Sequence, residues 1–231
     1  MLANWKNLII DLFFPKECLV CGRGDEHFCL TCQKKIVYLK DNVCLICNRQ
    51  PSTIGICSNC QPGISLDQII VSVRYKGTVI EKIIHEYKFN FIEELAEFLA
   101  NLLLEKISHQ NVHLDHTTIV CPIPLHPKRF AERGFNQSAV LAQFIAKGFG
   151  CQYQDKTIVR SKYTDQQAKL NRSERIDNLH QAFTINNHEL KNKTIVLVDD
   201  VITSGTTMNE AAKCLKQAGA ATVIAMAVAH N

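Results

Sequence analysis

Apolar residues follow two different patterns along the chain. Over residues 17–64 they are interrupted by cysteine, glycine and proline, whereas beyond residue 65 they recur with the periods of strands and helices. Residues 68–74 alternate as a strand does, and residues 79–89 and 91–107 have the spacing of amphipathic helices. This change predicts a domain boundary near residue 65.

The second part continues as an alternation of strands and helices. Strands are predicted over 117–122, 193–198 and 222–228, and helices over 138–149, capped by Ser138, and over 206–218, stopped at Gly219. Because these strands are apolar throughout, they fit a parallel sheet buried on both faces. We therefore predict an α/β fold, with helices flanking the sheet and ligands at the carboxyl ends of its strands.

The first residues and the composition limit the class of protein. One face of a predicted amphipathic helix carries Trp5, Leu8, Ile9, Leu12 and Phe13, so this helix either lies on a membrane surface or docks on the body. We expect docking, because its polar face lacks the many Lys and Arg residues that anionic lipid favours. No apolar run approaches the roughly 20 residues that span a bilayer, so no stable membrane insertion is expected. With 46% hydrophobic and 21% charged residues and a net charge of +4, the 231-residue chain should fold as an ordinary globular protein. The predicted units are a helix over 1–16, a cysteine-rich module over 17–64 and the α/β domain over 65–231.

Eight of the eleven cysteines form four Cys-x-x-Cys pairs. They are Cys18 and Cys21, Cys29 and Cys32, Cys44 and Cys47, and Cys57 and Cys60. The N-terminus has no signal-peptide pattern, which predicts a cytoplasmic, reducing location where such pairs bind zinc and do not form disulfides. We expect one or two structural Zn²⁺ ions in a double zinc ribbon. The spacing allows either sequential pairing or a cross-braced arrangement.

The main chemical signal follows the strand predicted near residue 195. The segment Asp199-Asp200-Val201-Ile202-Thr203-Ser204-Gly205-Thr206-Thr207 places two acids and four hydroxyl residues around one glycine, directly before a helix. Successive N–H groups and hydroxyls at a helix N-terminus can surround a phosphate, and adjacent carboxylates can accept hydrogen bonds from vicinal hydroxyls. No lysine follows Gly205, which excludes a Walker A loop. The segment predicts a sugar-phosphate site.

This segment resembles the phosphoribosyl pyrophosphate (PRPP) motif of type I phosphoribosyltransferases. The resemblance implies that Asp199 and Asp200 hold the ribose hydroxyls. It also implies that Thr203, Ser204, Gly205, Thr206 and Thr207 bind the 5-phosphate, with Mg²⁺ carried on the pyrophosphate.

A second resemblance covers nearly the whole chain. The four cysteine pairs, Leu12 to Pro15, Tyr87-Lys88-Phe89, and the stretch from Pro122 through Arg133-Gly134-Phe135-Asn136-Gln137 are similar to the ComF family of competence-associated proteins. That family implies a double zinc ribbon joined to a phosphoribosyltransferase-like domain. It also implies a role in handling incoming single-stranded DNA during natural transformation, with a competence helicase as a further partner.

Two basic segments suggest where anions bind. Lys128, Arg129 and Arg133 surround Gly134 in a predicted loop whose position in the family fold meets pyrophosphate. Residues 160–175 are predicted to form a cationic lid whose nucleic-acid contacts are Lys162, Lys169, Arg172 and Arg175. From Lys128 to Arg175 there are ten Lys or Arg and four acids. This excess predicts weak, salt-dependent binding of single-stranded DNA through its backbone.

Two functions remain open. An active transferase would use Asp199, Asp200 and Arg133 as catalytic residues and transfer ribose 5-phosphate from PRPP to a nucleobase-like acceptor. No base-binding segment is recognisable after the last predicted strand, so a binding module for PRPP and DNA is the preferred interpretation. Lys88, at a predicted helix end, is either a functional cation or a lysine that covers apolar surface.

Overall fold

The computed structural model describes residues 16–40, 43–49, 52–90, 92–110, 112–160, 182–186 and 189–231. Its helices are α2 (Leu30–Gln33), α3 (Val79–Phe89), α4 (Glu93–Ser108), α5 (Pro127–Arg133), α6 (Gln137–Phe149) and α8 (Thr206–Gln217), with a 3₁₀ turn η1 (Gln61–Gly63). Its strands are β1 (Gln68–Arg74), β2 (Ile119–Pro122), β3 (Gln152–Tyr153), β4 (Ile158–Arg160), β5 (Phe183–Ile185), β6 (Thr194–Ile202) and β7 (Thr222–His230).

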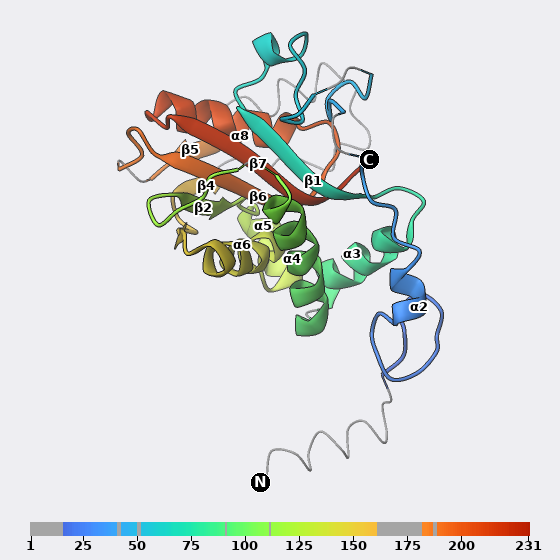
Figure 1. Ribbon diagram of the computed structural model, residues 1–231. Helices are drawn as coiled ribbons and strands as arrows, with labels where there is room; N and C mark the ends of the chain where they lie inside the picture. Colours follow the sequence, from blue (N-terminus) through green and yellow to red (C-terminus); the bar gives the residue numbers. More distant parts are fainter. Residues whose placement is uncertain are drawn as a thin grey trace.

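Five strands form one parallel sheet in the order β1-β7-β6-β2-β3. Helices α3, α4 and α6 cover one face and α8 covers the other, as Figure 1 shows. Strands β4 and β5 form a separate antiparallel pair beside the sheet. The predicted α/β class, with a parallel sheet between helices, is confirmed.

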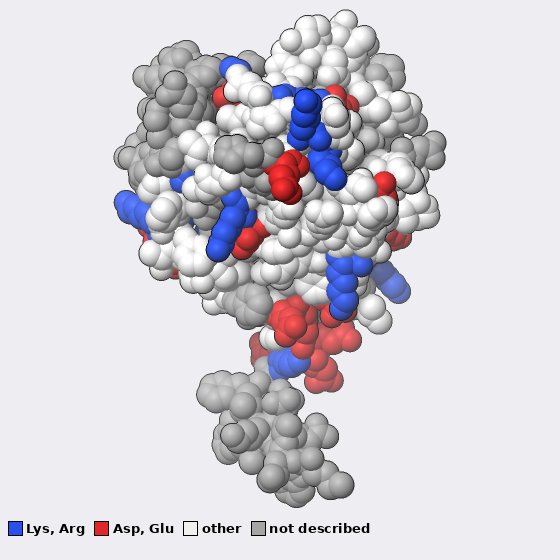
Figure 2. All heavy atoms as spheres, turned by 90° about the vertical axis from the view of Figure 1, so that its left-hand side faces the viewer, with Lys and Arg blue, Asp and Glu red and all other residues white. Residues whose placement is uncertain are grey.

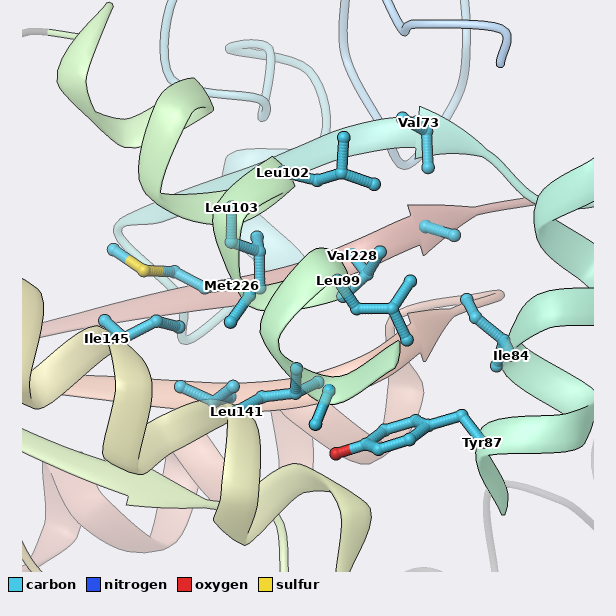
Figure 3. Close-up of a cluster of buried hydrophobic side chains, with 14 of the residues drawn as sticks. Val73, Ile84, Tyr87, Leu99, Leu102, Leu103, Leu141, Ile145, Met226 and Val228 are labelled. Carbon is cyan, nitrogen blue, oxygen red and sulfur yellow. The ribbon is translucent and has the colours of Figure 1, made fainter. Parts of the chain in front are cut away.

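The core consists of two apolar layers because successive residues of each strand point to opposite faces. On the α3, α4 and α6 face, Val73, Met226 and Val228 of the sheet pack against Leu99 and Leu141 (Figure 3). On the other face, Leu197 and Ala225 pack against Ala211 and Leu215 of α8. Both faces of the central strands are therefore buried, which explains why their sequences lack alternation.

Several predicted elements differ from the structure at their ends. Strand β6 extends to Ile202, so both acids lie inside the strand and not beyond it. Helix α6 is capped by Asn136, whose Oδ1 accepts the N–H of Ser138, and not by Ser138 itself. Helix α4 starts at Glu93 and ends at Ser108, a shift from the predicted 91–107.

The predicted loop around Gly134 is also corrected. Residues 127–133 form helix α5, which starts with Pro127 at its first position and ends at Gly134 with φ 78°. None of its residues is buried, so the sequence had no apolar stripe to reveal it. Lys128, Arg129 and Arg133 are thus presented by a helix.

The cysteine-rich module covers the open edge of β1. The N–H of Leu39 donates to the carbonyl of Ser72 at 3.0 Å, and the N–H of Arg74 donates to Val37 at 2.8 Å. Further along, the N–H of Ile69 donates to Ile54 at 2.9 Å. Next to it, a side chain at Gly55 would place its Cβ 2.2 Å from the Ile69 carbonyl oxygen, so only glycine fits. The edge strand of the sheet is therefore paired over much of its length.

Two predictions concern residues outside the part of the chain that the structure describes. The N-terminal helix lies outside the described residues, and so do Lys162, Lys169, Arg172 and Arg175. In the part of the chain that the structure describes, no helix has both the length and the apolar character needed to cross a bilayer.

Candidate functional site

A cavity of about 270 Å³ opens at the carboxyl ends of β6 and β2, where a ligand site is expected in this kind of sheet. It brings together six of the ten residues that the sequence predicted for the PRPP site. Its lining consists of Tyr75, Lys88, Ile123, Pro124, Leu125, Arg129, Arg133, Gln137, Ser138, Arg160, Asp199, Asp200, Val201, Thr203 and Thr207.

The acidic pair is held by specific partners. The hydroxyl of Ser138 donates to Asp199 Oδ1 at 2.8 Å, and the backbone N–H of Asp200 donates to the same oxygen at 2.9 Å. Lys88 Nζ lies 3.0 Å from Asp200 Oδ1. Burial, together with the neighbouring charge of Asp200, raises the pKa of Asp199 to about 6. The pair is thus fixed in position, with one carboxyl that titrates close to neutrality.

The hydroxyl-rich loop follows directly. A small cavity of about 50 Å³ is lined by Asp199, residues 201–207 and Met208. Gly205 has φ 72° and is the N-cap of α8, a 12-residue helix, and the hydroxyls of Ser204 and Thr206 lie 2.8 Å apart. The first N–H groups of a helix have no partner within it, so the loop presents donors to an anion.

Four cationic side chains line the larger cavity within the described part of the chain: Lys88, Arg129, Arg133 and Arg160. The ion pair with Asp200 shows that Lys88 is a site residue and not a lysine that merely covers apolar surface. Arg160 was assigned to the lid from its sequence, but it lies in β4, with its guanidinium 5.7 Å from the ring centre of Phe183. Burial and the nearby charge of Arg129 lower the pKa of Arg160. Lys128 lies on α5 beside Arg129 but outside the lining of this cavity.

Gln137 connects the segments that carry Lys88 and Arg133, and no local sequence pattern pointed to this role. Its amide nitrogen donates to the Lys88 carbonyl at 2.9 Å, while its Oε1 accepts from Arg133 at 3.1 Å. The hydroxyl of Tyr87 donates to the Gln137 carbonyl at 2.8 Å. Gln137 is 1% exposed. This buried network fixes the ends of α3, α5 and α6 relative to one another.

The eight cysteines form two separate clusters. Cys18, Cys21, Cys29 and Cys32 make the first, and Cys44, Cys47, Cys57 and Cys60 the second, with all sulfurs of a cluster within 4.8 Å of one another. The Sγ atoms of Cys21 and Cys29 are 3.8 Å apart, and those of Cys47 and Cys57 are 3.9 Å apart. A tetrahedral zinc ion with bonds of about 2.3 Å holds its sulfurs about 3.8 Å apart, so both clusters fit structural zinc. The pairing is sequential.

In the first cluster, backbone N–H groups stabilise a cysteine thiolate, the form that binds a metal ion. The N–H of Cys29 points to Cys18 Sγ at 3.5 Å. Burial raises the pKa of the Cys18 thiol, but backbone N–H groups, that of Cys29 first, outweigh burial and lower the pKa to about 6. A thiolate at this position is thus already stabilised for metal binding.

The two clusters pack on opposite faces of the sheet, which explains why they are not cross-braced. Around the first cluster, Phe28 contacts Phe98 of α4 with ring centres 5.0 Å apart, and Cys18 and Cys32 join the core on that face. Around the second, Ile56, Leu45 and Ile46 pack on the α8 face. The chain passes from one to the other over the edge of β1.

Known proteins share this combination of parts. A model of the phosphoribosyl transferase domain matches residues 136–231, and a model of the double zinc ribbon domain matches residues 9–61. DNA utilization protein YhgH of Salmonella typhimurium is 30% identical over 212 residues, which are 84% of this chain and 93% of that protein. Competence protein F of Haemophilus influenzae is 30% identical over 221 residues, 90% of this chain and 93% of that protein. Competence protein ComFC of Bacillus subtilis is 26% identical over 206 residues, which are 86% of this chain and 82% of that protein.

A phosphoribosyltransferase-type domain carrying a double zinc ribbon is the class that fold, site and comparisons define together. Within that class, the chain belongs to the ComF family of competence-associated proteins. The family resemblance inferred from the sequence is confirmed.

Proposed function

We propose that this protein binds PRPP with Mg²⁺ in the cavity at the carboxyl ends of β6 and β2. The proposal depends on one observation: an acidic pair, a hydroxyl-rich loop and four cations converge on one site. Asp199 and Asp200 accept hydrogen bonds from the ribose hydroxyls. The N–H groups and hydroxyls of residues 203–207 surround the 5-phosphate at the start of α8.

The cations suit the pyrophosphate. Arg129, Arg133 and Arg160 come from two different elements and line the same cavity, so they can contact more than one phosphate oxygen. Lys128, one residue from Arg129, adds positive charge on α5. Mg²⁺ bound to the pyrophosphate would neutralise part of its charge. Lys88 instead lies against Asp200 and adds a positive charge beside the acidic pair.

Transfer of the ribose 5-phosphate to an acceptor is the alternative function, and binding alone does not require it. Incubation of labelled PRPP with a panel of nucleobases, with and without single-stranded DNA, separates the two functions. A binding module leaves the label on PRPP, whereas a transferase moves it to one of the bases.

Binding of PRPP is expected to strengthen as the pH rises from 5 to 7.5. The pKa of Asp199 is raised to about 6, so this carboxyl is neutral at pH 5 and ionised at pH 7.5, where it accepts ribose hydroxyls best. About tenfold weaker binding is expected one pH unit below that pKa. Titration calorimetry with Mg²⁺ and PRPP measures the affinity at each pH.

The variant Asp199→Asn controls for the titration of PRPP itself. Because asparagine does not ionise, the difference in pH dependence between wild type and variant belongs to Asp199, with Lys88 and Asp200 as its charged neighbours. Identical profiles for the two proteins would contradict the assignment.

A second candidate function, contact with single-stranded DNA, is favoured by two exposed aromatic residues that neighbour cations of the same cavity. Phe89 is 58% exposed and Phe130 is 49% exposed. The Arg133 guanidinium lies 5.7 Å from the Phe89 ring centre, and Phe130 follows Arg129 on α5. Aromatic rings beside cations are what single-stranded nucleic acids use, through base stacking and phosphate contacts. The relatives named for DNA utilization and competence support the same role.

The cations that line the cavity indicate where such DNA would be held. Figure 2 shows the side of the molecule at which the parallel strands begin, opposite to the cavity, and there lysines and arginines stand in small groups with acidic side chains between them. We infer local contact beside the cavity, through the cations that line it, extended by Lys162, Lys169, Arg172 and Arg175 of the predicted lid. The expected competence helicase stays a predicted partner.

Binding of an oligodeoxynucleotide is expected to fall steeply with salt, with a logarithmic slope of about −0.7 per phosphate contacted. Reversing Lys169 and Arg172 to Glu should reduce that slope, and Phe89→Ala should weaken binding by about fivefold or more through lost stacking. Fluorescence anisotropy at several salt concentrations measures both effects.

Tyr38→Ala, which removes an equally exposed ring between the ribbons, is the matched control. Salt-independent binding would contradict the role of these cations, and equal loss in the two aromatic variants would contradict stacking on Phe89.

A further inference from the structure

The second cysteine cluster lies directly against the loop that begins α8. Ile46 stands between Cys44 and Cys47, and its Cδ1 is so close to Gly205 that a Cβ added there would lie 3.3 Å from it. Ile46 also packs on the apolar layer that contains Ile202 and Met208, the residues on either side of the loop. The metal-binding turn therefore forms one wall of the candidate phosphate loop.

Asn209 makes a second connection between the two parts. It lies in the first turn of α8, and its N–H donates to the Gly205 carbonyl at 2.9 Å. Its side-chain Oδ1 accepts the N–H of Ser65 at 2.7 Å, and its Nδ2 donates to the Gly63 carbonyl at 3.5 Å. Gly63 and Ser65 follow the last cysteine of the cluster, Cys60. The loop is thus connected both to the start of the cluster and to the chain that leaves it.

The first cluster has no comparable relation to this loop among the described contacts. Its neighbours Phe28 and His27 contact Phe98 and Glu94 of α4, on the other face of the sheet. The residue that corresponds to Ile46 is Val20, between Cys18 and Cys21, and it packs on the apolar layer of that face. The two ribbons therefore differ in what they support.

We infer that the second zinc ribbon positions the phosphate loop through Ile46 and Asn209, so that zinc held by Cys44, Cys47, Cys57 and Cys60 and a sugar phosphate on residues 203–207 stabilise each other. The inference deepens the proposed function and depends on its phosphate site. Because coupling between two sites is reciprocal, the ligand must strengthen zinc binding at the second cluster by the same free energy with which zinc improves ligand binding. The first cluster does not take part.

The first test compares Ile46→Ala with Val20→Ala, which removes the corresponding side chain from the first ribbon. Ile46→Ala is expected to weaken binding of ribose 5-phosphate about tenfold, while Val20→Ala leaves it unchanged. Pyrophosphate, whose proposed partners lie on α5 and β4, should bind both variants as it binds wild type. Ile46→Leu, which keeps a carbon atom at the δ position, should restore binding of ribose 5-phosphate. Calorimetry measures all of these affinities.

The second test measures zinc transfer to a chromogenic chelator. At equilibrium, ribose 5-phosphate should reduce the transfer of one of the two zinc ions from wild type and from Val20→Ala to the chelator. In Ile46→Ala, both ions should be present at the start and neither should be protected by the ligand. Equal ligand affinity and equal protection in the two variants would overturn the inference.

A third measurement does not depend on any ligand. Amide hydrogen exchange over residues 203–209 should be several-fold faster in Ile46→Ala than in Val20→Ala, because the loop loses its wall. If wild type binds neither ribose 5-phosphate nor pyrophosphate, the proposed function fails while this difference in exchange still supports positioning by Ile46. If exchange is the same in the two variants, positioning by Ile46 is wrong even where ribose 5-phosphate binds.

Discussion

Replacing Asp199 and Asp200 together by alanine is expected to abolish Mg²⁺-dependent binding of PRPP, with a loss of more than about 100-fold. Two charge-assisted hydrogen bonds to the ribose disappear, each worth about 1.5–3 kcal/mol. Lys88 also loses the carboxylate that it contacts at 3.0 Å. Titration calorimetry gives the affinity, and circular dichroism checks that the sheet is intact.

The matched control is Glu97→Gln, which removes an exposed acid from α4 without touching the cavity. It should bind PRPP as wild type does. Pyrophosphate alone should still bind the double variant, because Arg129, Arg133 and Arg160 remain. An unchanged affinity of the double variant for PRPP would move the sugar site elsewhere in the molecule.

Protein purified without added zinc is expected to contain two zinc ions per chain, and Cys18→Ser and Cys57→Ser are each expected to lose one. Structural zinc in small Cys sites contributes about 10–16 kcal/mol of binding free energy, which is also folding free energy. Cys18→Ser should loosen the first ribbon while the sheet and the binding of ribose 5-phosphate persist. Metal analysis and thermal unfolding of both variants measure these effects.

The separation of the clusters sharpens this expectation. Since each set of four sulfurs lies within 4.8 Å and the sets pack on opposite faces, the loss of one ion should leave the other in place. Loss of both ions from either single variant would contradict independent sites. Fully folded, metal-free wild-type protein would contradict structural zinc altogether.

The sequence predicted the elements that carry their own local signal. Helix α3 has a clear apolar stripe and was predicted with the observed bounds of Val79 and Phe89. The core of β6 and the acidic pair within it were found because a buried parallel strand is apolar on both faces. The cysteine pairs identified both metal clusters because each Cys-x-x-Cys signal spans only four residues.

What could not be predicted depends on distant partners. The pairing of Lys88 with Asp200 joins residues far apart in the chain, and the spacing of Lys88 alone left its role open. Strand β4, which presents Arg160, pairs with β5, which follows the predicted lid in the sequence. Each strand has only three residues, so neither had a recognisable pattern. The choice between sequential and cross-braced zinc pairing was likewise decided by docking on two faces of the sheet and not by spacing.

The covering of β1 by the cysteine-rich module has a consequence for self-association. A sheet edge with free N–H and carbonyl groups pairs readily with another chain, and proteins avoid this by covering or shortening such edges. Here β3, at the opposite edge, has only two residues, while β1 has seven and relies on Val37, Leu39 and Ile54 for its cover. Those covering residues lie between zinc ligands, so loss of metal is expected to expose the seven-residue edge strand while the body of the sheet is still folded. We therefore expect zinc at these clusters to protect against aggregation between native-like molecules, which would begin before any global unfolding.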